Sequence, residues 1–156
     1  MRVNIVAVGK IKEKYFTDAI GEYAKRLSRF CEFSVIEVDE YKNQKTCEEE
    51  ILITKKKEGE RLLQKAKGMV IAMDKEGKML SSEELAYKIK DICTYNASEI
   101  SFLIGGSNGL SDEVIKRADY IISFGKITYP HQLMRVILSE QIYRAFTINN
   151  SVPYHK

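Results

Sequence analysis

The chain has 156 residues, of which 44% are hydrophobic and 30% charged, and its formal net charge is +3. This length supports one domain with a hydrophobic core and is too short for two domains of ordinary size. The composition is that of a globular protein, and no apolar run approaches the ~20 residues that a membrane span needs. A strand-like pattern begins at once, with no signal segment before it, so we expect a cytoplasmic location.

Net charge and cysteine content limit the kinds of partner and cross-link that we expect. A small positive charge permits a polyanionic partner without requiring one, because affinity for nucleic acid depends on how many phosphates are neutralised. The three cysteines, Cys31, Cys47 and Cys93, are far apart and form no C-x-x-C pair. We therefore expect free thiols, buried or half-buried, rather than a disulfide framework or a metal site.

Strand-like and helix-like patterns alternate along the chain. Short β-rich apolar runs predict five strands, at 2–8, 33–38, 69–74, 99–104 and 120–124. Apolar residues at helical spacing predict five helices, at 13–29, 47–67, 82–95, 111–118 and 130–148. A polar loop is expected at 39–45, a turn at 76–78, and N-caps at Ser81 or Ser82 and at Ser111. This alternation predicts an α/β fold, a single domain with a mostly parallel sheet flanked by helices.

A glycine-rich segment, Gly105-Gly106-Ser107-Asn108-Gly109, follows the fourth predicted strand. Glycine permits positive φ and lets the backbone approach a ligand closely. The segment could form a nucleotide or adenosine pocket, or it could be a tight turn that merely needs glycine. Its spacing matches neither the dinucleotide fingerprint nor a P-loop, so neither of those ligand classes is indicated.

The connection after the fifth predicted strand is unusually apolar. Connections of this kind are mostly polar and run to 2–6 residues, whereas this one carries Phe124, Ile127 and Tyr129. These side chains could pack on the core or on a partner chain, or they could wall an adenine ring. Because the glycine segment ends a neighbouring strand at the same sheet edge, we favour a ligand site.

The last predicted helix is apolar around most of its circumference, which favours burial on more than one side and hence a dimer interface. Arg135 lies one turn into this helix, where it could hold a substrate phosphate or stabilise an anionic base. Composition predicts a frayed terminus at 154–156. Lys10, Lys12 and Lys14, after the first strand, are better placed for phosphate contact than the lysines at 55–57.

Five segments together resemble the ribosomal RNA large subunit methyltransferase H family, the YbeA-like branch of the SPOUT methyltransferases. They are Val-Gly-Lys-Ile-Lys at 8–12, Leu-Ile-Gly-Gly-Ser-Asn-Gly-Leu at 103–110, Tyr-Pro-His-Gln-Leu-Met-Arg-Val at 129–136, Glu-Gln-Ile-Tyr-Arg-Ala at 140–145 and Tyr-His-Lys at 154–156. The resemblance spans the whole chain.

The resemblance implies a homodimer with a C-terminal trefoil knot over roughly 69–156, which binds S-adenosylmethionine. The implied reaction is methyl transfer to N3 of a pseudouridine in 23S rRNA within the assembled 70S ribosome, and no metal is implied. Carried over by position, the cofactor contacts fall on Met73, Gly105, Gly106, Phe124, Gly125, Lys126, Ile127, Thr128 and Tyr129. Many relatives have leucine at the position of Met73.

The resemblance also suggests roles in catalysis and RNA binding. His155 is the candidate for proton acceptance or base orientation, Tyr154 for stacking, and Lys156 or Arg135 for stabilising charge. The RNA contacts are expected at Lys10, Lys12 and Lys156. Two alternatives stay open: a non-catalytic ribosome-binding or assembly factor, and a Rossmann-like oxidoreductase, which the missing glycine fingerprint disfavours.

Overall fold

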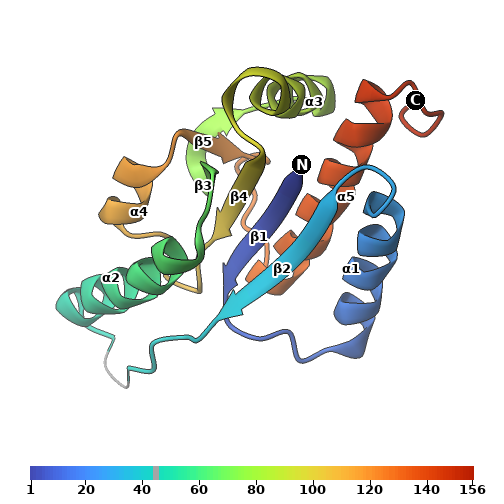
Figure 1. Ribbon diagram of the computed structural model, residues 1–156. Helices are drawn as coiled ribbons and strands as arrows, with labels where there is room; N and C mark the ends of the chain where they lie inside the picture. The colour runs from blue at the N-terminus through green and yellow to red at the C-terminus, as the bar shows by residue number, and fades with distance from the viewer. Residues whose placement is uncertain (44–45) are drawn as a thin grey trace.

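Five strands form one parallel sheet in the computed structural model, which describes residues 1–43 and 46–156 (Figure 1). The strands are β1 (Arg2–Val8), β2 (Glu32–Val38), β3 (Met69–Met79), β4 (Glu99–Ile104) and β5 (Tyr120–Ser123). They lie in the order β2-β1-β4-β3-β5, and each neighbouring pair runs parallel. The predicted α/β fold with a mostly parallel sheet is confirmed. The carboxyl ends of the strands share one edge, where such folds bind ligands.

The burial of each strand follows from its place in the sheet. β1 and β4 are covered on both faces, and their sequences are therefore almost continuously apolar. The edge strand β2 is mostly exposed or half-buried, and only Val38 at its end is buried. This difference explains why 33–38 shows an alternating pattern that 99–104 lacks.

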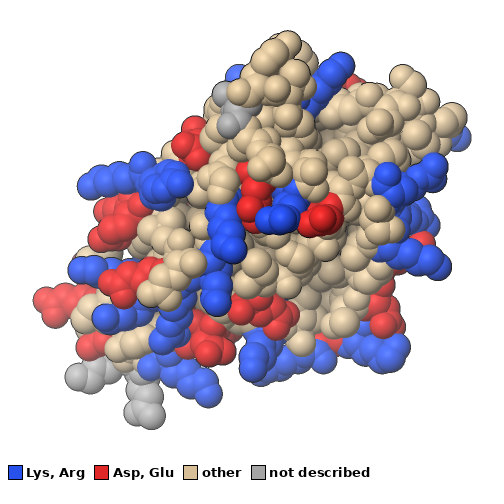
Figure 2. Space-filling model, in the orientation of Figure 1, with Lys and Arg blue, Asp and Glu red and all other residues tan. Residues whose placement is uncertain are grey.

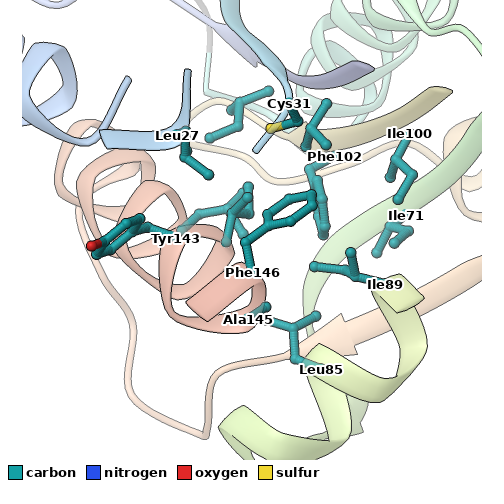
Figure 3. Packing of buried hydrophobic residues seen from close by; sticks show 14 of the residues in the cluster. Leu27, Cys31, Ile71, Leu85, Ile89, Ile100, Phe102, Tyr143, Ala145 and Phe146 are labelled. Atoms are coloured by element: carbon teal, nitrogen blue, oxygen red, sulfur yellow. The ribbon is translucent and has the colours of Figure 1, made fainter. Parts of the chain in front are cut away.

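Helices cover both faces of the sheet. One face carries α1 (Lys14–Leu27), α3 (Ser82–Asp91), the short π-helical turn η1 (Ile92–Asn96) and α5 (His131–Asn149), and the other carries α2 (Glu48–Lys65) and α4 (Asp112–Arg117). In the larger core, Leu27 of α1, Ile89 of α3 and Phe146 of α5 surround Phe102 of β4 (Figure 3). A smaller core joins α2 and α4 to the opposite face.

Local sequence signals determine where the helices begin. Ser81 caps α3 through a capping box: its hydroxyl accepts a hydrogen bond from the Glu84 N–H (3.1 Å), and the Glu84 carboxylate accepts one from the Ser81 N–H (2.7 Å). Ser111 caps α4 by accepting a hydrogen bond from the Val114 N–H (3.3 Å). The five predicted helices begin and end within two residues of the observed ones, if η1 is counted with α3.

The prediction of a turn at 76–78 is wrong, because β3 continues to Met79. Met73 and Lys78 both pair with Ile122, so the four residues between them bulge out of the strand. A Cβ on Gly77 would lie 2.8 Å from the backbone of Ile122, so the glycine here permits close approach between strands. The bulge brings residues 74–76 to the carboxyl edge of the sheet.

The thiols are free, as expected, but only Cys31 is buried, and Cys47 and Cys93 are exposed. The predicted loop at 39–45 includes residues 44 and 45, which lie outside the described part of the chain. Within the described ranges, no helix combines the length and apolar character needed to cross a bilayer, and no cluster of three His, Cys, Asp or Glu side chains could hold a metal ion.

Candidate functional site

A cleft of about 760 Å³ lies at the carboxyl edge of the sheet. Its walls come from the β3 bulge, the glycine segment after β4, the connection from β5 to α5, and the first turn of α5. The volume is in the range of about 300–1,000 Å³ that small-molecule sites occupy. Eight of the nine residues expected to contact a cofactor line this cleft, and only Lys126 does not: Met73, Gly105, Gly106, Phe124, Gly125, Ile127, Thr128 and Tyr129.

The glycine segment forms a tight turn that also lines the cleft. The Gly109 N–H donates a hydrogen bond to the Gly106 carbonyl (3.0 Å), which closes the turn. A Cβ on Gly105 would lie 2.7 Å from the Gly109 carbonyl carbon, so no larger residue fits there. The sequence left open whether the segment is a tight turn that needs glycine or part of a ligand pocket. The two interpretations are compatible, because the same turn requires glycine and lines the cleft.

The connection between β5 and α5 is held by one hydroxyl group. Ser123 Oγ donates to the Gly125 carbonyl (2.9 Å) and accepts from the Gly125 N–H (3.1 Å). Gly125 has φ +113°, a conformation that side chains rarely tolerate. Phe124 and Tyr129 are half-buried, but the Ile127 side chain is 71% exposed. This apolar residue lines the cleft without being covered by its own chain.

Glu58 of α2 is buried directly behind the glycine segment. Its Oε1 accepts a hydrogen bond from the Tyr41 N–H (3.1 Å), and a Cβ on Gly106 would lie 2.9 Å from its Oε2. Oε2 has no hydrogen-bond partner among the described residues. Burial raises the pKa of Glu58, although the bond from Tyr41 acts in the opposite direction. Sequence reasoning missed this residue, because α2 carries so many charged residues that it looks like a solvated helix.

His131, the first residue of α5, also lines the cleft and is half-buried. Burial lowers the pKa of His131, the positive charge of Arg135 lowers it further, and only Glu40 acts to raise it. No role was predicted for this histidine from the sequence. The available signal was its position at the start of a helix that follows a strand end at the ligand edge.

Arg135 is completely buried and does not line the cleft. Its Nη2 donates to the Val8 carbonyl (2.6 Å), and its Nη1 pairs with Glu37 (3.3 Å). Burial lowers the pKa of Arg135, against the pull of Glu37. In this chain the guanidinium ties the start of α5 to the end of β1.

The C-terminal tail is ordered against α5, contrary to the fraying that composition predicted. The Tyr154 ring packs edge-on against Tyr143 (4.8 Å between centroids), and its hydroxyl donates to Glu140 (3.1 Å). Burial, followed by this hydrogen bond, raises the pKa of Tyr154 to about 12. His155 contacts Arg144 through Nδ1 (3.2 Å) and Glu83 through Nε2 (2.7 Å).

The tail follows the C-terminal end of α5 (Figure 1), whereas the first turn of the same helix lines the cleft. The 19 residues of this helix span about 28 Å at ~1.5 Å per residue. Lys10 and Lys12 are exposed in the segment that follows β1, at the carboxyl edge, whereas Lys156 is exposed on the tail. One chain therefore does not bring the predicted catalytic residues of the tail together with its own cleft.

Charges of both signs are interspersed on the face of the molecule seen in Figure 2. Lys and Arg side chains alternate with Asp and Glu, above all over α2. This face therefore presents no single-sign field that would hold a long polyanion.

The chain matches known proteins over its full length. A family described as "Predicted SPOUT methyltransferase" matches residues 1–155. The chain is 55% identical to the ribosomal RNA large subunit methyltransferase H of Latilactobacillus sakei subsp. sakei (strain 23K) and 56% identical to that of Lactobacillus acidophilus, with 100% of both chains covered in each case. The fold resembles a probable methylase family protein from Haemophilus influenzae Rd KW20, with a TM-score of 0.53 and 13% identity, over 99% of this chain and 70% of that chain.

These matches give the oxidoreductase alternative no support. They agree with the resemblance drawn from the five sequence segments. The chain belongs to the SPOUT methyltransferase family and, within it, to the ribosomal RNA large subunit methyltransferase H family.

Proposed function

We propose that this protein transfers a methyl group from S-adenosylmethionine to N3 of a pseudouridine in 23S rRNA, acting in the cytoplasm on the assembled 70S ribosome. The observation that carries the proposal is the glycine-lined cleft at the carboxyl edge of the sheet, in a chain 55% identical throughout to ribosomal RNA large subunit methyltransferases H. The trefoil knot over roughly 69–156 is part of this proposal.

The residues of the cleft fit the methyl donor. Cβ atoms placed on Gly109 and Gly125 would meet no atom within 4 Å, so the backbone at both positions borders open space. Backbone N–H and C=O groups with no side chain in front of them suit hydrogen bonding to the edge of an adenine ring. The apolar residues Met73 and Phe124 suit packing against its faces. The bound donor supplies a methyl group already activated on a sulfonium, so the protein mainly has to align the reacting atoms.

A homodimer would bring the tail to the cleft. Because the two lie about 28 Å apart along α5, a second copy is needed to place Tyr154 and His155 beside the methyl group. The exposed Ile127 and the half-buried apolar residues of α5 would be covered in such a pair. Lys10 and Lys12 of one copy and Lys156 of the other would then flank the RNA.

We assign Tyr154 to stacking on the target base and His155 to orienting it. Arg135, being buried, would act indirectly by fixing the start of α5, whose first turn lines the cleft. RNA recognition would rely on the shape of the ribosomal site, since the charge of the protein is small.

Transfer of a radiolabelled methyl group to 70S ribosomes that lack the modification tests the proposal. We expect one labelled nucleotide in 23S rRNA, located by nuclease mapping and identified by mass spectrometry. Free 23S rRNA is the control for the need of an assembled ribosome. If S-adenosylhomocysteine stabilised the protein but no label were transferred, the non-catalytic assembly factor would be the better description.

A further inference from the structure

Methyl transfer to N3 requires a group that accepts the N3 proton. A suitable group needs a lone pair that faces the cleft and is not already hydrogen-bonded. The chain has two histidines, His131 and His155, and they differ in this respect.

His155 has no free lone pair in its observed position. A guanidinium can only donate hydrogen bonds, so Nδ1 of His155 must accept from Arg144 (3.2 Å). Nε2 then carries the proton and donates to the Glu83 carboxylate (2.7 Å). These two contacts fix the orientation of the ring, which suits a group that positions the base, and they leave no site for another proton.

His131 meets the requirement from inside the cleft. His131 lines the cleft, as do Met134 and Tyr129, and neither of its ring nitrogens is hydrogen-bonded within the described ranges 1–43 and 46–156. It is half-buried at the N-terminus of α5, where the helix dipole disfavours an added positive charge. The ring is therefore neutral near pH 7 and keeps one lone pair.

The charged groups around His131 reinforce this state. Arg135, one turn further along α5, disfavours the imidazolium, while Glu40, after β2, favours it. Burial and Arg135 outweigh Glu40, so the pKa of His131 lies below the ordinary value. Lys55, Asp74, Lys75 and Glu76 line other parts of the cleft, on α2 and the β3 bulge.

The start of α5 lies close to the end of β1, because Arg135, one turn after His131, donates to the Val8 carbonyl (2.6 Å). Glu40 lies against Gly9, where a Cβ would come 2.6 Å from its Oε1. Gly9 is followed directly by Lys10, the first of the predicted phosphate contacts. The first turn of α5, which bears His131, thus lies near the point where the segment carrying Lys10 and Lys12 leaves the sheet.

We propose that His131 accepts the N3 proton of the target base, while Tyr154 and His155 of the tail orient that base. The inference rests on the proposed function. The N3–H bond breaks as the proton moves to the free imidazole nitrogen of His131, and the N3 electron pair forms the new bond to the methyl carbon. The bond from that carbon to sulfur breaks, its electrons stay on sulfur as an uncharged thioether, and the imidazolium returns the proton to water.

Single-turnover methylation of 70S ribosomes separates the two histidines. His131→Gln keeps a polar side chain of similar reach without a titratable nitrogen, and it should lower the rate at saturation about 100-fold, the usual loss for a general base. Its affinity for S-adenosylhomocysteine, measured by calorimetry, should stay within about threefold. His155→Gln should instead raise KM for ribosomes.

The pH dependence provides a second readout. The rate of the wild-type protein should fall below the pKa of His131, with a slope of one in a plot of log rate against pH, and His131→Gln should lose that limb. Imidazole NMR of His155→Gln shows His131 alone, and its titration midpoint should lie below the unperturbed value of about 6.5.

The outcomes distinguish the two proposals. If wild-type protein transferred no methyl group at all, the proposed function would fail, whatever the His131 midpoint. If transfer occurred and His131→Gln kept the rate and the acidic limb, His131 would not be the proton acceptor. If His131→Gln lost mainly affinity for S-adenosylhomocysteine, His131 would be a cofactor contact, and the inference would be overturned.

Discussion

The residues of the cleft show how much one missing side chain can matter. Gly105 and Gly21 are both glycines, but the space around them differs. A Cβ on Gly105 would lie 2.7 Å from backbone, whereas a Cβ on Gly21 in α1 would meet nothing within 4 Å. The first glycine is required by packing, and the second only adds flexibility to a helix.

Gly105→Ala should therefore destabilise the protein by about 1–3 kcal/mol, the usual cost of forcing an extra methyl group into a packed site. It should also weaken S-adenosylhomocysteine binding, because the turn at Gly109 must move. The matched variant Gly21→Ala should raise stability by about 0.5–1 kcal/mol and leave binding unchanged. Urea unfolding and calorimetry measure both effects, and equal behaviour of the two variants would contradict the role given to Gly105.

Glu58 supports a prediction about pH. Burial raises its pKa in the folded state above the value in the unfolded chain. Its contribution to stability is therefore fully present below the unfolded pKa of about 4.3 and is lost as pH rises through the folded pKa. Glu58→Gln should remove this loss, so the variant should gain stability relative to wild type between pH 4 and neutral pH.

The control is Glu60→Gln on the same helix, where the carboxylate is exposed and pairs with Lys57. It should show no such gain. Urea unfolding at a series of pH values measures the difference, and parallel stability curves for wild type and Glu58→Gln would contradict burial of an ionisable carboxyl group behind the glycine segment.

At the scale of elements, the start of α3 depends on reciprocal capping. Ser81→Ala removes the acceptor for the Glu84 N–H and should cost about 1 kcal/mol. Glu84→Gln keeps an oxygen for the Ser81 N–H and should cost less than Glu84→Ala, which keeps none. Thermal unfolding followed by circular dichroism ranks the three variants, and equal losses for Gln and Ala would show that the reciprocal bond contributes nothing.

The helices and strands were predictable where residues close in sequence determine them. Apolar runs gave the five strands, and Ser81 and Ser111 gave two helix starts within two residues. The end of β3 was missed because Glu76-Gly77-Lys78 has the composition of a turn, while its conformation depends on pairing with β5. No local pattern reports the position of a strand 40 or so residues further along the chain.

The position of the cleft was predictable from the ends of the strands, whereas some of the structure around it was not. Glycines and apolar residues after β4 and β5 marked the cleft, because carboxyl ends of parallel strands meet at one edge. Glu58 was missed because its burial comes from contact with a segment about 50 residues away. Composition alone predicted a frayed tail, because the packing of the tail depends on Tyr143, Glu140 and Glu83, which the fold alone brings together.

For the whole molecule, the separation of cleft and tail leads to a prediction about mixed assemblies. Gly105→Ala should damage the cleft, and a chain lacking residues 154–156 should lack the tail. If each site combines the cleft of one copy with the tail of the other, neither variant methylates ribosomes alone. Mixing them, with exchange of subunits, should restore activity because some hybrids pair an intact cleft with an intact tail.

Sedimentation velocity should show a dimer for the wild type and for both variants, so that loss of activity is not loss of assembly. Mixing wild type with either variant serves as the control for subunit exchange. If the hybrids stayed inactive although exchange was demonstrated, each chain would have to use its own tail, and α5 would have to rearrange.

If Lys10 and Lys12 contact RNA as proposed, Arg135 would favour that binding. Its guanidinium bonds the Val8 carbonyl, and the Gly9 N–H bonds the Val38 carbonyl, so the root of the segment bearing Lys10 and Lys12 is held from two sides. The side chains of both lysines remain free in solvent. A lysine on a fixed backbone segment loses only side-chain conformational entropy when it binds a phosphate. It does not lose the backbone entropy of about 1–2 kcal/mol per residue that ordering a flexible segment costs. On the proposed function, a protein with a net charge of only +3 would in this way bind RNA through few contacts.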